Sequence, residues 1–185
     1  MYSIDVISIK DYFLLDDRSE YDMFIESIKP ENRLCGKVCN MTNITFDEVE
    51  VIKKMLIDPS ANDLAELFTE MYHIKGSQKE SGKDIYYKES IFQLFRVLNH
   101  FRDWMEALLK KEIEWLSGEP SEALQMIGAG KRLAHVNHIL TKIDIAEMFA
   151  TTPDDIGKWK YGKVFGIMVA LKLRNEIQKE INELK

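Results

Sequence analysis

The sequence predicts an all-α protein, an irregular multi-helix bundle with two long helices at about residues 86–116 and 161–184. Two observations lead to this prediction. Apolar residues recur at every third or fourth position over most of the chain, which is the period of one helix face. Serine, threonine and proline residues stand at the starts of these periodic stretches, where helix-capping residues belong.

The N-terminus has a different pattern, because Tyr2, Ile4 and Val6 alternate with polar residues as in a half-buried strand. One strand cannot form a sheet alone. Residues 1–7 therefore stay open between helix and a strand that joins the sheet edge of a partner. Ser8 and Asp11 have the spacing of a capping box, which predicts a helix from Ile9 to Leu15.

Prolines and caps place the next helices. Pro30 closes the segment 20–29, and a capping box at Thr45 and Glu48 starts a helix over 46–57 that ends before Pro59. Ser60 caps the helix that follows. The apolar stripe of that helix consists of Leu64, Leu67, Phe68 and Met71.

Residues 75–83, with the sequence KGSQKESGK, lack both large apolar side chains and a helical period. Their glycines and serines favour a flexible surface loop. We therefore predict an N-terminal helical subdomain at 1–74, a linker at 75–85 and a C-terminal helical subdomain at 86–185. The helix at 86–116 would be roughly 45 Å long, which is more than a small domain buries alone.

The second half contains several shorter helices before the last long one. Ser117 and Gly118 end the helix at 86–116, and Pro120 starts a short helix that reaches residue 127. Further helical pieces are predicted at 131–140 and 143–150. Thr152 and Pro153 start another helix. The apolar positions of the helix at 161–184 drift around its axis, which predicts contacts with more than one neighbour.

Composition limits the class of protein. The 185 residues are 45% apolar and 30% charged, as in ordinary globular domains. No apolar run approaches the roughly 18 residues that span a bilayer, so we expect no membrane span. Cys35 and Cys39 have a spacing that would place both thiols on one helix face, and they lack the second pair of a zinc site. Reduced thiols in a cytoplasmic protein are the expectation.

Charge is distributed unevenly along the chain, whose net charge is −6. Residues 1–74 include seven basic and 15 acidic residues, whereas residues 158–185 include seven basic and three acidic ones. An acidic front and a basic tail predict charge-guided contact, either within one chain or between copies.

Residues that could support catalysis are sparse. Residues 128–131, Gly-Ala-Gly-Lys, lack the spacing of a phosphate loop. His135 and His138 share a helix face, and Glu70 and His73 match half of a di-iron pattern. We predict no enzyme activity, no cofactor and no metal site. The alternative is a cytoplasmic helical-bundle enzyme with a His/carboxylate metal site that uses His73, His135 or His138.

A candidate partner interface comes from aromatic residues and lysines near the last long helix. Residues 158–163 interleave the two types, as in proteins that bind nucleic acid. The net negative charge of the chain argues against nucleic acid as a partner. The competing interpretation is that the aromatic rings pack the helix start while the lysines stay in water. The candidate residues are Trp104, Trp115, Lys158, Trp159, Lys160, Tyr161 and Lys163.

Several short stretches also resemble a known class of protein. They are residues 8–13 (SIKDYF), 44–49 (ITFDEV), 63–67 (DLAEL), 144–149 (DIAEMF), 153–156 (PDDI) and 161–165 (YGKVF). Together they resemble the small helical assembly and structural proteins of tailed bacteriophages, of the tail-assembly chaperone or head-to-tail connector type. This resemblance implies a non-enzymatic protein that self-associates or joins a larger assembly, in the host cytoplasm or the virion. A host helical adaptor or regulator is the alternative.

The loop at residues 75–83 gives a first testable prediction. Because it has nothing apolar to anchor it, limited proteolysis should cut the native protein there first. Mass spectrometry of the first fragments identifies the site of cleavage. A first cut between Phe92 and Leu109 would contradict the prediction.

Overall fold

The computed structural model describes residues 6–56, 60–77, 79–118, 132 and 136–184. It is mostly helical, so the predicted all-α class is confirmed. Two compact units share the chain, and each combines segments that are distant in sequence. Unit 1 consists of Met1–Asn40 and Ile52–Ala107, and unit 2 of Met41–Val51 and Leu108–Lys185.

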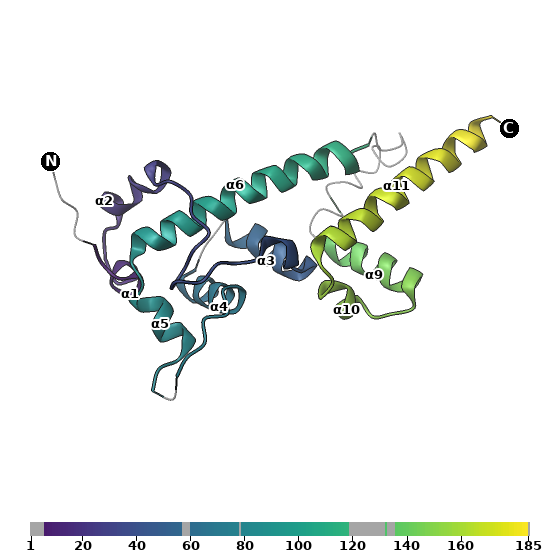
Figure 1. Cartoon of the computed structure of the whole chain (residues 1–185). Helices are drawn as coiled ribbons and strands as arrows, with labels where there is room; N and C mark the ends of the chain where they lie inside the picture. The colour runs from purple at the N-terminus through teal and green to yellow at the C-terminus, as the bar shows by residue number, and fades with distance from the viewer. Residues whose placement is uncertain (1–5, 57–59, 78, 119–131, 133–135, 185) are drawn as a thin grey trace. The chain divides into compact units, whose positions relative to one another are not determined.

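Within the described ranges the extended backbone is limited to isolated bridges and connections (Figure 1). The helices are α1 (Ile9–Phe13), α2 (Ser19–Asp22), α3 (Phe46–Met55), α4 (Ala61–Met71), α5 (Gly82–Lys88), α6 (Ile91–Leu116), α9 (Asn137–Phe149), α10 (Pro153–Gly157) and α11 (Tyr161–Glu183). Short 3-10 helices cover Ile25–Ser27 and Met41–Asn43.

The predicted helix starts are confirmed wherever a cap was expected. Ser8, Ser60 and Thr152 each accept a hydrogen bond from the backbone N–H three residues later. Thr45 and Glu48 bond reciprocally, since each side chain accepts from the backbone N–H of the other, at 3.3 and 2.7 Å. These bonds satisfy N–H groups that a helix cannot pair internally, so the caps determine where the helices begin.

The long helix predicted at about 86–116 is present as α6 over Ile91–Leu116, but residues 86–88 belong to α5 and a break separates the two helices. Glu89 is extended, with ψ of 155°, and its carbonyl accepts from Ile9 N–H at 2.8 Å. Ile91 N–H donates to the Ile7 carbonyl at 3.0 Å. The two bonds flank a bridge between Ser8 and Ser90. Pairing with the N-terminal segment interrupts the helix, and it also places Ile7 in an extended contact within the chain.

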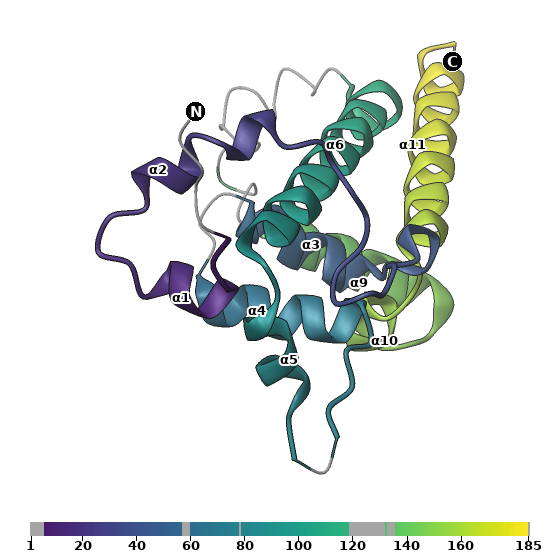
Figure 2. The ribbon, with the colours of Figure 1, turned by 60° about the vertical axis from the view of Figure 1, so that its left-hand side comes forward.

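The predicted division at 75–85 also differs from the observed units, because this segment lies inside unit 1. It joins α4 to α5, and these helices pack against each other (Figure 2). Ser77 and Glu80 close the loop through a backbone bridge. The loop is therefore a connection within one unit, and Lys75, Gly76, Ser77 and Lys79 are exposed on it.

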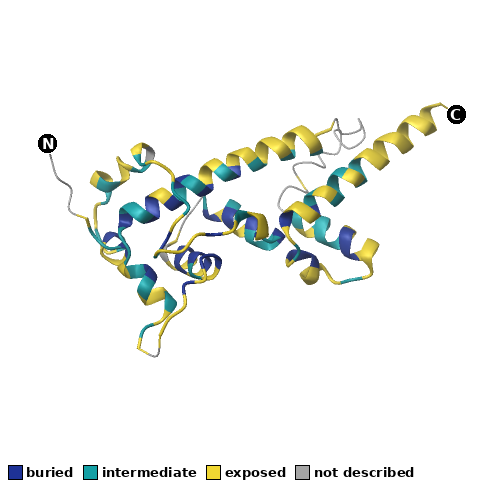
Figure 3. Ribbon diagram, in the orientation of Figure 1, coloured by how far each residue is buried: buried dark blue, intermediate teal, exposed yellow. Residues whose placement is uncertain are grey.

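The core of unit 1 is aromatic, and it lies between α1, α4 and the first half of α6 (Figure 3). Phe101 on α6 contacts Phe68 and Tyr72 on α4, with ring centroids 5.4 and 6.4 Å apart. Nearer the start of α6, the ring of Phe95 meets the ring of Tyr12 edge-on, with centroids 5.5 Å apart. These contacts bury the periodic apolar face that the sequence predicted.

Cys35 lies in a turn and Cys39 lies just beyond it, so the two thiols do not share a helix face. Leu34 and Lys37 pair across the turn, and Cys35 and Gly36 have positive φ angles of 47° and 72°. Glycine adopts this left-handed conformation readily, whereas a helix excludes it. Cys39 is buried, and its backbone exchanges hydrogen bonds with the Asn32 side chain.

Unit 2 differs from the prediction in one helix. Asn137–Phe149 forms the continuous helix α9, where separate pieces at 131–140 and 143–150 were expected. The start of the first piece, the short helix at 120–127 and the glycine break at 128–130 lie outside the described residues. Helix α9 packs against α10 (Figure 1). The last helix, α11, matches the predicted range of 161–184.

Asn99 gives a prediction for the stability of unit 1. It is 6% exposed in the middle of α6, and its amide donates to the carbonyls of Ile25 and Ile28 at 2.5 and 2.9 Å. Asn99→Ala would leave both carbonyls without this donor, and we expect a loss of about 1–3 kcal/mol in the free energy of unfolding. Urea denaturation measures the loss. The control Asn175→Ala, at an exposed site, should change stability by less than about 0.5 kcal/mol.

Candidate partner interface

Backbone pairing in unit 2 positions the segment with the predicted partner residues. Phe46 N–H donates to the Trp159 carbonyl at 2.9 Å, and Tyr161 N–H donates to the Ile44 carbonyl at 2.8 Å. These bonds form a short antiparallel bridge centred on Thr45 and Lys160. They hold Lys160 extended between α10 and α11, immediately before α11 begins at Tyr161.

Tyr161 points inward and is only 7% exposed. Its ring stacks between Phe46 and Phe165, with both centroid distances at 6.1 Å, and its hydroxyl donates to Glu112. Burial, followed by this hydrogen bond, raises the pKa of Tyr161 above its ordinary value. Tyr161 therefore belongs to the core, and its inclusion in the candidate interface is corrected.

Trp159 is half-buried and has a different environment. The ring of Phe149 meets it edge-on, with centroids 5.4 Å apart, and Lys163 Nζ lies 3.1 Å from its ring centroid. The position of the ammonium over the indole face is a cation–π contact. Phe149 is itself about half exposed. Trp159, Lys163 and Phe149 thus form an aromatic surface with a positive charge above it.

The other two lysines of the segment remain at the surface. Lys158 and Lys160 are both exposed, and Lys158 Nζ lies 3.8 Å from Asp155. Hydrogen bonds, first among them that from the Thr152 hydroxyl, lower the pKa of Asp155. An exposed ion pair at this distance contributes little stability. Lys158 and Lys160 are therefore available for contact with an acidic partner.

The two remaining tryptophans of the prediction fall in different units. Trp104 in unit 1 is half-buried beside Phe101, with centroids 6.4 Å apart. Trp115 in unit 2 is 50% exposed near the end of α6, and Ile113 beside it is 66% exposed. Lys172 Nζ donates to the carbonyls of Trp115 and Ser117 at 3.3 and 2.6 Å, which caps this helix end. Trp115 and the lysine segment therefore belong to the same unit, unit 2, whereas Trp104 belongs to unit 1.

Asp47 forms an ion pair with a mostly buried lysine, a feature typical of functional sites that the sequence analysis missed. Its carboxylate accepts from Lys142 Nζ at 2.9 Å, and the lysine side chain is mostly buried. Gly157 makes room for this pair, because a Cβ there would lie 2.0 Å from Asp47 Oδ2. The sequence offered no signal for the contact, since 95 residues separate its two partners. We interpret the pair as structural, because it joins the start of α3 to the middle of α9.

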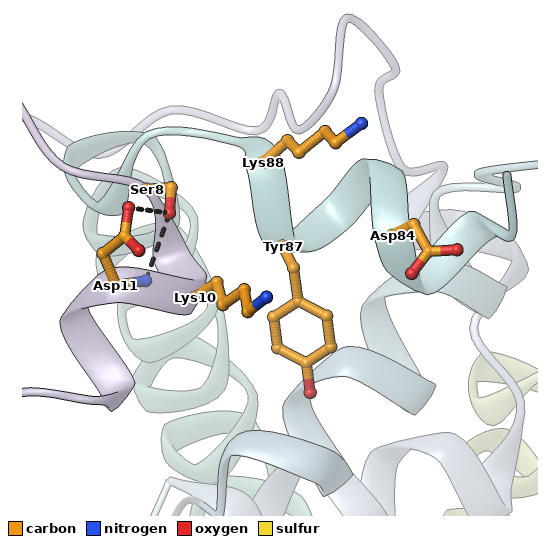
Figure 4. Close-up of a pocket in the computed structure, with 6 residues that line it drawn as sticks. All are labelled: Ser8, Lys10, Asp11, Asp84, Tyr87 and Lys88. Atoms are coloured by element: carbon orange, nitrogen blue, oxygen red, sulfur yellow. Dashed lines mark hydrogen bonds between the residues drawn. The ribbon is translucent and has the colours of Figure 1, made fainter.

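A hollow in unit 1 lies between α1 and α5 (Figure 4). Its volume is about 470 Å³, and its lining residues are Ser8, Lys10, Asp11, Asp84, Tyr87 and Lys88. The lining carboxylates already serve as cap partners: Asp11 bonds with Ser8 at the start of α1, and Asp84 with Ser81 at the start of α5. The Ser81 hydroxyl lowers the pKa of Asp84. The hollow suits water or a small polar molecule, and its polar groups are explained by helix capping.

The Cys35 thiol is held in its protonated form. Its backbone N–H donates to Glu89 Oε2 at 3.0 Å, and the side chain is partly buried. Burial, and then the Glu89 charge, raises the pKa of Cys35 to about 12. A nucleophilic cysteine needs the opposite shift, because the thiolate is the reactive form.

The histidines considered for a metal site are dispersed. His73 is exposed just beyond the end of α4, His138 is half-buried at the start of α9, and Asp144 is exposed. Among the residues that the structure describes, no three His, Cys, Asp or Glu side chains are placed to hold a metal ion. His135 and the glycine-lysine segment 128–131 lie outside the described residues.

Comparison with known proteins gives no relative. No protein-family model matches the chain, and neither a curated protein nor a solved structure matches it. Within the described part of the chain, no helix is both long and apolar enough to cross a membrane. The inference about function therefore rests on the residues and contacts above.

Cys35 gives a prediction with a pH dependence. Because its pKa is raised from 9.0 to about 12, its alkylation by iodoacetamide at pH 8 should be on the order of a thousandfold slower than that of a model thiol. The rate should still rise above pH 10. Trypsin cleaves after Arg33 and Lys37, so mass spectrometry separates Cys35 from Cys39.

The variant Glu89→Gln tests the cause. It removes the negative charge beside the thiol, so it should lower the pKa of Cys35 and increase the alkylation rate at pH 8. The control Glu20→Gln, at an exposed site, should leave the rate unchanged. A wild-type rate equal to that of a model thiol would contradict the assigned protonation state.

Proposed function

We propose that the chain is a non-enzymatic structural or assembly protein that acts through helix-mediated contacts with other proteins. The proposed setting is a tailed-phage particle or its assembly, in the host cytoplasm or the virion, as the resemblance in the sequence implies. Copies of the chain or a larger component would be its partners.

The main support is the amount of apolar side chain that unit 2 leaves exposed on its helices. Large exposed residues occur on the end of α6, on α9 and on α11 (Figure 3). They include Leu109, Ile113, Trp115, Ile139, Met148, Phe149, Leu173 and Ile177. Single exposed apolar residues are ordinary, but groups of them on neighbouring turns of a helix commonly mark interfaces.

Charge supplies a second support. Lys158, Lys160 and Lys163 are exposed within six residues, beside the half-exposed rings of Trp159 and Phe149. Aromatic rings are favoured in the centres of protein interfaces, whereas lysines belong to their polar rims. In an interface the rings would provide buried area, while the lysines would guide an acidic partner into register.

Fractionation from the native source tests the proposal. Wild-type protein should sediment with a larger assembly, identified by mass spectrometry of the co-purified components. Reversal of charge in the triple variant Lys158→Glu, Lys160→Glu, Lys163→Glu should release it, because the new carboxylates repel an acidic partner surface. The matched control reverses three exposed lysines of unit 1, Lys37, Lys75 and Lys79.

The control has the same change in net charge, so it separates a local contact from a general electrostatic effect. We expect the control to remain with the assembly. Wild-type protein that sediments as a free monomer from its native source would contradict the proposal, and equal release of both variants would remove the lysine segment from it.

A further inference from the structure

Helix α11 carries a continuous apolar stripe on its exposed side. Every residue of the stripe is exposed, in a part of the chain that the structure describes throughout (Figure 3). The stripe consists of Gly162, Gly166, Ala170, Leu173, Ile177, Ile181 and Leu184. At about 100° of rotation per residue, all seven positions fall within an arc of about 100°, and the exposed charged residues Glu180 and Lys163 lie at its two edges. They form one face, 23 residues long.

The opposite face of α11 already packs within unit 2. Tyr161 and Val164 are buried there, and Ile167, Met168 and Leu171 are half-buried. The helix therefore has two apolar faces, which explains the drift of its apolar positions around the axis. The inward face is covered only as far as Lys172, because every described residue of α11 from Leu173 onward is exposed.

The stripe follows an 11-residue repeat. Position 162 recurs at 173 and 184, position 166 at 177, and position 170 at 181. Eleven residues over three turns give 3.67 residues per turn, close to the 3.6 of a straight α-helix. A stripe with this period stays on one side of the helix along its whole length, so a second helix can follow it with little supercoiling.

We propose that this face binds the same face of a second copy of the chain, with the two α11 helices antiparallel and Leu173 at the two-fold axis. This inference rests on the proposed function, of which it specifies one partner. In this register residue 162 lies opposite 184 of the other copy, and 166 and 170 lie within one residue of the positions opposite 181 and 177.

The gradation of side-chain size along the stripe supports the antiparallel register. Its first half has only glycine and alanine, whereas its second half has only leucine and isoleucine. Antiparallel pairing places the large side chains at 177, 181 and 184 opposite small ones, whereas Leu173 meets its own copy at the axis. Parallel pairing would crowd the large residues at one end and leave a gap at the other.

The two glycines give independent support. A Cβ atom at Gly162 or Gly166 would have nothing within 4 Å, so the monomer has no steric need for glycine there. Glycine inside a helix is destabilising relative to alanine. Close approach of another helix explains both positions, because glycine leaves room for the isoleucine or leucine of the second copy.

Charge also favours the antiparallel arrangement. Residues 158–163 include three lysines and no acidic residue, whereas residues 174–185 include three basic and three acidic residues. A parallel pair would bring two lysine-rich ends together. The antiparallel pair places each lysine-rich end beside a neutral one, and it also opposes the two helix dipoles.

The contact area sets the conditions of the experiment. Two helices in contact over the 23 residues of α11 share a strip about 35 Å long and about 10 Å wide, roughly 350 Å² on each copy. A standard interface covers about 800 Å² on each partner. The dimer should therefore dissociate on dilution, so mass must be measured over a wide range of concentrations.

Sedimentation equilibrium of the full chain tests the dimer. Wild-type protein should change from monomer to dimer with increasing concentration. Gly166→Leu should raise the Kd at least about tenfold, because the new side chain fills the space for Ile181 of the other copy. The control Asn175→Leu adds the same side chain at an exposed position outside the stripe, and it should leave the Kd unchanged.

Leu173→Glu is a second variant, since its charge would face the same charge across the axis. Circular dichroism should show wild-type helix content for all three variants, because each changes an exposed side chain. Wild-type protein that stays monomeric at every concentration would overturn the proposal, as would a dimer unaffected by both Gly166→Leu and Leu173→Glu.

Cysteine cross-linking tests the direction of the helices. A mixture of Gly166→Cys and Ile181→Cys proteins should form a disulfide-linked dimer under mild oxidation. Each variant alone should form no more than wild-type protein, which carries the same Cys35 and Cys39. Cross-linking of Gly166→Cys with itself would overturn the antiparallel register.

These results are separable from the proposed function. A monomeric wild-type protein that still sediments with a larger assembly, and is released by the lysine reversals, would disprove the α11 dimer and leave the assembly function supported. Conversely, the protein could form a dimer that Gly166→Leu abolishes and yet sediment without a larger assembly from its native source. That result would support the α11 dimer and disprove the assembly function.

Discussion

The arrangement of unit 2 depends on two backbone hydrogen bonds that join residues 44–46 to residues 159–161. These bonds hold Lys160 in a bridge and start α11 at Tyr161. Tyr161 consequently enters the core, where it stacks on Phe46, while the lysines on both sides of it remain in water. The same pairing sets where α11 begins, and so it decides which face of that helix packs inward and which stays exposed.

Unit 1 is closed by the same device, in which residues 7–9 pair with residues 89–91. In both units a few extended residues link segments that are more than 80 positions apart, and they do so beside a helix start. Such links have no period of their own, so they are weakly visible in a sequence. Their effects on helices are large nevertheless, since the pairing at Glu89 divides what periodicity alone predicts to be one helix into α5 and α6.

This difference explains how much could be predicted. The all-α class and the starts at Ser8, Thr45, Ser60 and Thr152 follow from local chemistry, which neighbouring residues in the chain determine. The break at Glu89, the division into units and the turn at Cys35 depend on distant partners, and they were missed. The candidate interface could be predicted only in part. The pattern at 158–163 marks the connection between α10 and α11, but it does not distinguish the buried ring of Tyr161 from the half-exposed ring of Trp159.

The exposed face of α11 raises the question of how a chain keeps leucine and isoleucine at its surface without indiscriminate aggregation. Charged residues flank the stripe, and they pair along the helix as Lys172 with Glu176 and Lys179 with Glu183. Such pairs contribute little to stability, but they would have to lose water in any contact wider than the stripe. The flanks therefore restrict binding to a narrow partner such as a single helix. A narrow apolar strip between charged margins allows reversible association, which is what the proposed assembly function would require.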